Sequence, residues 1–194
     1  MKARYTPISA ALLAAGLSTL PNLSQAAGFV EDAKVNLNLR NYYINRNFVD
    51  ESPQNYAEEW TQNFILDARS GYTEGTVGFG VDALGMLSIK LDGGRGTAGT
   101  QLIPVHDDGR PADEWGRLAV AGKARFSKTE LKVGEWMPVL PILRADDGRS
   151  LPQTFQGGQI TSQEIAGLTL YGGQFRQNSP RNDGSLEDMS YGGG

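Results

Sequence analysis

The stretch that decides the fold is Trp60-Thr61-Gln62-Asn63-Phe64-Ile65-Leu66-Asp67-Ala68-Arg69-Ser70-Gly71-Tyr72. Its even-numbered positions are mostly apolar and carry an aromatic residue at each end, whereas its odd-numbered positions are mostly polar and include charges. Alternation with a period of two indicates a β-strand with two unlike faces, because a helix would repeat every three or four residues. The length suits a tilted membrane-spanning strand of about 9–11 residues.

The same alternation recurs along the chain. It predicts further strands over 35–43, 76–83, 117–126 and 131–134, and two less regular β segments over 154–165 and 168–176. These segments together predict an all-β chain with about seven strands.

The links between the strands differ in length. Short links are predicted near 73–75, 127–129 and 166–167, and long ones over 46–59, 91–114 and 137–153. Short and long links therefore alternate, which is typical of antiparallel up-and-down transmembrane β-barrels with short periplasmic turns and long external loops. A soluble β-sandwich has no physical reason to sort its links in this way.

The N-terminus has the layout of a secretory signal peptide. Lys2 and Arg4 precede an apolar stretch over 8–20, and Ser24-Gln25-Ala26 supplies small residues for cleavage. We therefore expect residues 1–26 to be a cleaved signal peptide and residues 27–194 to form the barrel portion.

Composition excludes several classes of protein. The chain has no cysteine, so it is not a disulfide scaffold. Removing Lys2 and Arg4 from the 18 basic residues leaves 16 against 22 acidic ones, a mature net charge of −6 that argues against nucleic acid as a partner. No stretch after Ala27 approaches the roughly 20 apolar residues of a spanning helix.

Motifs for catalysis or cofactors are weak. Gly94-Arg95-Gly96-Thr97-Ala98-Gly99 fits G-x-G-x-x-G, but no helical pattern follows it, so a flexible external loop is expected. His106 is the only histidine, and Asp107-Asp108-Gly109 lacks the spacing of an EF-hand. We expect no enzyme activity, cofactor or metal. An exported hydrolase that uses carboxylates remains one alternative.

The third long link mixes apolar and charged residues. Pro138 and Pro141 stiffen it, and it carries the charged residues Arg144, Asp146, Asp147 and Arg149. A loop folded into a barrel would pack its apolar residues on the wall and turn its charges toward a narrow aqueous path, where they select charged solutes. The alternative is that these charges are solvated at an external loop tip.

Several motifs resemble the OprD-type outer-membrane porins. In the third link these are Gly134-Glu135-Trp136, Pro138 with Pro141, the acidic pair with Arg149, and 151–157. Segments 28–32, 37–43 and 164–168 resemble the family as well, so the likeness covers essentially the whole mature chain.

The resemblance implies a function. Members of the family are monomeric or weakly associated outer-membrane barrels of about eighteen strands. They take up small carboxylate-bearing nutrients, such as amino acids or aromatic acids, by passive diffusion. The resemblance further implies that the third loop folds inward as a constriction containing Arg144, Asp146, Asp147 and Arg149. A basic row on the inner wall guides the substrate in this family, and alternation places Arg69, Lys123 and Arg125 on the inward face as candidates for it.

The strand count bears on the extent of the chain. About seven strands would leave two unpaired edges in hydrocarbon, where open edges do not occur. We therefore expect the chain to be the N-terminal portion of a larger porin barrel that does not conduct alone. A soluble periplasmic or secreted β-sandwich that binds ligands is the other alternative.

Overall fold

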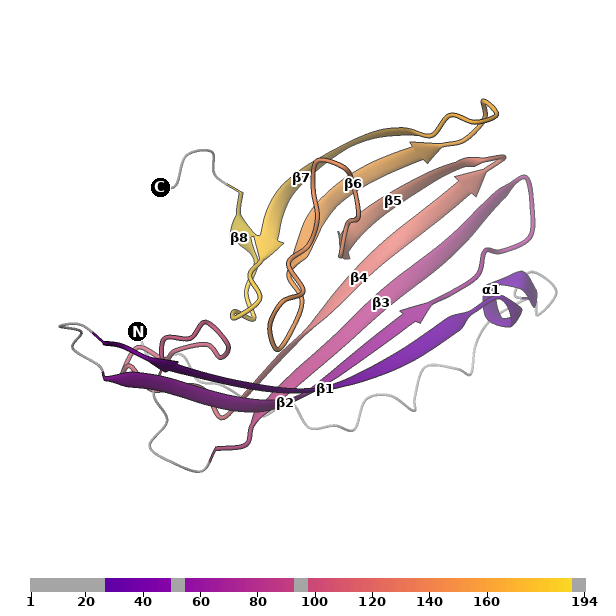
Figure 1. Cartoon of the computed structure of the whole chain (residues 1–194). Helices are drawn as coiled ribbons and strands as arrows, with labels where there is room; N and C mark the ends of the chain where they lie inside the picture. Colours follow the sequence, from indigo (N-terminus) through magenta and orange to yellow (C-terminus); the bar gives the residue numbers. More distant parts are fainter. Residues whose placement is uncertain (1–26, 50–54, 93–97, 190–194) are drawn as a thin grey trace.

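The computed structural model describes residues 27–49, 55–92 and 98–189, so the expected signal peptide lies outside the described residues. These residues form one eight-stranded antiparallel sheet in which every strand pairs with its neighbours in sequence (Figure 1). The only α-helix among them is not long enough to span a membrane. The elements are α1 (Ala27–Glu31), β1 (Lys34–Asn47), β2 (Tyr56–Arg69), β3 (Val77–Lys90), β4 (Glu114–Phe126), β5 (Thr129–Trp136), β6 (Thr154–Ser162), β7 (Leu170–Ser179) and β8 (Glu187–Asp188).

All seven predicted strands are present, and β8 is an addition. It pairs with β7 through only two residues, too few for alternation to reveal it. The prediction of a long first link over 46–59 was wrong, because β1 and β2 continue pairing as far as Asn47 and Tyr56. The first link is therefore shorter than the links over 91–113 and 137–153.

The sheet curves (Figure 1), and its two faces carry different side chains. On β2 the even-numbered Phe64 and Leu66 are exposed, while the odd-numbered Thr61 and Asn63 are buried. The exposed apolar face is the one that a barrel turns toward lipid, and the opposite face is the inner, concave one. No second sheet packs on this sheet in the described ranges, which removes the basis for a β-sandwich.

Gly134 allows β4 and β5 to approach each other closely. Its φ is +135°, and a Cβ at this position would lie 2.3 Å from the carbonyl oxygen of Val120. Only glycine combines this φ with this contact at low cost. The close approach helps the sheet to curve around its inner face.

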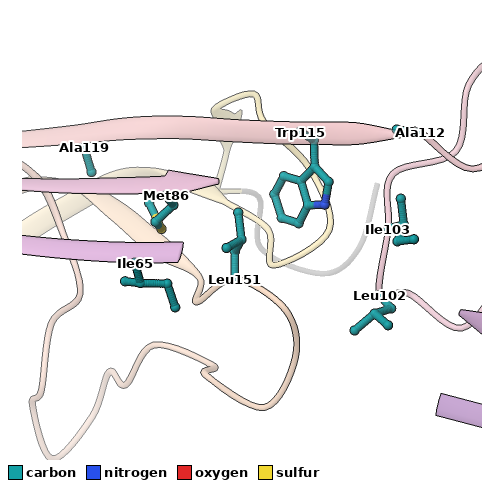
Figure 2. Close-up of a cluster of buried hydrophobic side chains, with 8 residues drawn as sticks. All are labelled: Ile65, Met86, Leu102, Ile103, Ala112, Trp115, Ala119 and Leu151. Carbon is teal, nitrogen blue, oxygen red and sulfur yellow. The ribbon is translucent and has the colours of Figure 1, made fainter. Parts of the chain in front are cut away.

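An apolar cluster lies on the inner face where two long links meet the strands (Figure 2). The strands contribute Ile65, Met86, Trp115 and Ala119, and the links contribute Leu102, Ile103, Ala112 and Leu151. Residues 94–97 of the glycine-rich motif lie outside the described residues. The expectation of a flexible external loop for that motif is therefore not tested, but the residues that follow it pack inward, because Thr100, Leu102 and Ile103 are buried.

Two of the short turns are joined at the opposite end of the sheet. The carboxylate of Glu164, before β7, accepts hydrogen bonds from the Lys128 backbone N–H at 2.8 Å and from the Ser127 and Thr129 hydroxyls at 3.0 Å. These donors lower the pKa of Glu164. The turns between β4 and β5 and between β6 and β7 are thereby held side by side.

Candidate functional site: a loop across the inner face

The loop between β5 and β6, residues 137–153, crosses the inner face of the sheet. It reaches β1, where the Tyr42 hydroxyl donates to the carbonyl oxygen of Gly148 at 3.0 Å. It also reaches β2, where the Thr61 and Ser150 hydroxyls lie 2.8 Å apart and buried. Because β2, β3 and β4 lie between β5 and β1 in the sheet, the loop spans most of the concave side.

Local contacts shape the loop before it reaches β1. A tight turn brings Leu140 N–H within 2.9 Å of Leu143 O, and the Asp146 carboxylate accepts a hydrogen bond from Gly148 N–H at 2.8 Å. Leu140 and Leu151 are buried, whereas Ile142 is 94% exposed. The apolar residues of the loop therefore pack on the wall only in part.

Both acidic residues of the loop are bound by arginines from other segments. Arg40 on β1 binds the two carboxylate oxygens of Asp147 at 2.8 and 3.1 Å. Arg181, in the 180–186 link between β7 and β8, lies 2.5 Å from Asp146. Each loop carboxylate is thus neutralised by an arginine that lies outside the loop.

The two basic residues of the loop have no carboxylate partner in the described part of the chain. Arg144 is exposed, and no hydrogen bond or ion pair joins its side chain to another described residue. Arg149 donates to Gly148 O at 3.1 Å, and its buried Nε has no partner. Counted together with Arg40 and Arg181, the arginines that belong to the loop or bind it there as ion pairs exceed its two aspartates by two.

The other predicted basic residues form a separate group near the short turns. Lys123 binds Asp82 at 2.7 Å, Arg69 binds Asp67 at 2.7 Å, and the Arg125 guanidinium lies 4.1 Å from the centre of the Tyr72 ring. Among the described residues no hydrogen bond or ion pair joins this group to the 137–153 loop. The structure therefore places the two predicted sets of charges in two places.

Lys132 joins Arg69, Lys123 and Arg125 in this group of basic residues on the inner wall, the wall group. The sequence analysis did not single out Lys132. It lies opposite Lys123 in the register of β4 and β5 and binds the same Asp82 carboxylate at 2.5 Å. The alternation of β5 places Lys132 on the inward face, and this pattern could have identified it.

Arg117 also escaped prediction. Its guanidinium donates to the Ser179 hydroxyl and to the carbonyl oxygens of Pro180, Asp183 and Pro152. It thereby fastens the end of the loop and the 180–186 link to β4. Alternation places Arg117 on the inner face, but it gives no indication of these distant partners.

In the described residues no group of three or more His, Cys, Asp or Glu side chains could hold a metal ion. The groups that the loop and its partners present are arginines, aspartates and backbone carbonyl groups.

The sequence matches a known family and its members. Residues 27–194 match outer membrane porin, OprD family. Porin-like protein GalP of Pseudomonas putida is 70% identical over 173 residues, which cover 89% of this chain and 42% of GalP.

Solved structures share the fold. A BenF-like porin from Pseudomonas fluorescens has a TM-score of 0.81 and 73% identity over 84% of this chain and 42% of its own. OccK2 (OpdF) of Pseudomonas aeruginosa in complex with glucuronate has a TM-score of 0.70 and 62% identity over 84% of this chain and 38% of its own. OpdK of the same species with vanillate has a TM-score of 0.76 and 51% identity over 84% of this chain and 41% of its own.

These findings confirm the resemblance and the fold class predicted from the sequence. The chain spans less than half the length of the relatives that it matches. Those relatives are porins, which are transport channels rather than enzymes. The chain belongs to the OprD family of outer membrane porins.

Proposed function

We propose that this chain supplies the selective part of an outer-membrane channel for small carboxylate-bearing nutrients, such as amino acids or aromatic acids. Uptake is passive, and the 137–153 loop is the constriction. The chain reaches the outer membrane after cleavage of the 1–26 signal peptide, and the exposed apolar face of the sheet contacts lipid.

The charge balance around the loop carries this proposal. Asp146 and Asp147 are both neutralised by arginines, whereas the Arg144 and Arg149 side chains have no carboxylate partner in the described residues. Positive groups therefore remain available to a passing anion. In a narrow aqueous path such groups favour anions over neutral or cationic solutes.

The wall group and the relatives support the same choice. Lys123 and Lys132 share the single carboxylate of Asp82, so the inner wall also carries unbalanced positive charge. Glucuronate and vanillate, bound to two of the similar porins, are both carboxylates. We propose that Arg69, Lys123 and Arg125 form a path of positive charge that guides the substrate carboxylate beyond the loop.

A hybrid channel tests the proposal. Residues 27–194 replace the matching part of the BenF-like porin, and uptake of benzoate is compared with that of benzamide, its uncharged amide. We expect the double variant Arg144→Gln/Arg149→Gln to lower the benzoate-to-benzamide uptake ratio about fivefold, because two cations leave the path. Lys128→Gln, on an exposed short turn, is the control.

The ratio separates selectivity from damage to the channel. A closed or misfolded channel loses uptake of both solutes, so benzamide uptake reports whether a variant channel is open. A double variant that keeps benzamide uptake and has the same ratio as Lys128→Gln would contradict carboxylate selection by the loop.

A further inference from the structure

Arg181 lies where three segments of the chain meet on the inner face. It belongs to the 180–186 link, and its Nη1 lies 2.5 Å from the carboxylate of Asp146 in the 137–153 loop. Its Nη2 donates to the side-chain oxygen of Gln101 in the 91–113 link at 2.8 Å. One planar guanidinium therefore connects two loops that are distant in sequence.

The backbone around Gln101 is shaped for this contact. Gln101 has φ of +63°, a left-handed conformation that costs free energy in a residue with a side chain. Its neighbours are held on the wall, because the buried Thr100 donates its hydroxyl hydrogen to Glu59 and Leu102 lies in the apolar cluster (Figure 2). The flanking residues are thus buried, while Gln101 is exposed and binds Arg181.

Asp146 depends on Arg181 for its neutralisation. Its side chain is 45% exposed, and Arg181 is its only ion-pair partner among the described residues. Arg40 is occupied by Asp147. Without Arg181 the loop would carry an unpaired carboxylate beside the path.

We infer that Arg181 sets the local charge at the constriction formed by the 137–153 loop, although Arg181 itself lies outside that loop. It cancels Asp146 and positions that carboxylate against the 91–113 link. The inference rests on the proposed role of the 137–153 loop as the constriction. It makes Arg181 a specificity-determining residue for carboxylates.

Because the chain has no cysteine, one introduced thiol can report the local electrostatic potential. Ala145→Cys places a single thiol next to Asp146 in the hybrid channel, whose completing part is made free of cysteine, and the closed barrel is reconstituted in lipid nanodiscs. The thiol is modified in parallel by an anionic and by a cationic methanethiosulfonate, and the ratio of the two rates reports the local potential.

Arg181→Ala is expected to lower the anionic-to-cationic rate ratio about two- to threefold, as one screened unit charge at close range would. Arg181→Lys keeps the charge and is expected to preserve most of the ratio. Adding Asp146→Asn to Arg181→Ala restores the ratio, because it removes the exposed carboxylate. Arg176→Ala is the matched control, since the side chain of this exposed arginine hydrogen-bonds only to Gln174 in the described residues.

Three results would overturn the inference. The first is a rate ratio in Arg181→Ala equal to that in Arg176→Ala. The second is a lowered ratio that adding Asp146→Asn does not restore. The third is a thiol in the otherwise native chain that reacts as fast as one in an unstructured peptide. The rates do not depend on transport. A hybrid channel that fails to prefer benzoate would therefore refute the proposed function without changing the outcome at Arg181.

Discussion

Arg40 illustrates why the loop is held by arginine rather than lysine. Its two terminal nitrogens bind both oxygens of Asp147, and Nη1 also donates to the carbonyl oxygen of Arg149 at 2.7 Å. A planar guanidinium can make these bonds together, whereas an ammonium acts as a point charge and cannot reproduce the fork.

Arg40→Ala is expected to release residues 147–149 from β1. Hydrogen bonds to charged groups contribute about 1.5–3 kcal/mol each, so losing this contact should speed amide hydrogen exchange over 147–150 by roughly tenfold or more. Arg40→Lys should give an intermediate rate. Arg46→Ala, an exposed position on the same strand, is the control. Equal exchange in Arg40→Ala and Arg46→Ala would show that the loop is held by other contacts.

The sequence could predict the face on which an arginine lies, but not its partner. Alternation places Arg40 and Arg117 on the polar side of their strands. Their partners lie far along the chain, and which of them are reached depends on the path of the loop. Arg181 lies in an irregular link that has no periodicity, so no pattern in the sequence pointed to it.

The strands themselves could be predicted well because one face is mostly apolar. Their ends could not, since pairing continues wherever polar cross-strand partners fit. The extension of β1 and β2, for example, pairs Asn45 with Glu58 and Arg46 with Ala57. No apolar alternation marks such an extension.

Gly134 provides a test of how β4 and β5 fit together. Gly134→Ala adds a Cβ that meets Val120 O at 2.3 Å in a left-handed conformation. The backbone strain alone costs about 1–3 kcal/mol, so we expect the folded fraction to fall roughly tenfold or more. The readout is heat-modifiable migration of the hybrid channel in detergent gels.

Gly122→Ala is the matched control for this change. Gly122 lies on the exposed face of β4, and a Cβ there would have its nearest neighbour at 4.0 Å. We expect it to retain the heat-modifiable band. Similar bands for the two variants would mean that β4 and β5 are not as close as the structure places them.

At the scale of the whole molecule, two long links rather than one enter the concave side. The family resemblance predicted only the third. The second brings Leu102 and Ile103 into the same cluster as Leu151 (Figure 2). This apolar pair is too short to stand out in a polar link. Only the folded structure shows that both links pack against the same part of the inner face.

The position of the 137–153 loop across the inner face of the sheet is tested most directly by a cross-link between Thr61→Cys and Ser150→Cys. The two native hydroxyl oxygens are 2.8 Å apart, which puts the β-carbons within reach of a disulfide, and the chain has no other cysteine. The control pair is Thr61→Cys with Ser127→Cys at the short-turn end. We predict nearly complete cross-linking of the 61–150 pair under mild oxidation and none of the control pair. Failure of the 61–150 pair to cross-link in a folded, heat-modifiable chain would contradict a loop that lies across the inner face.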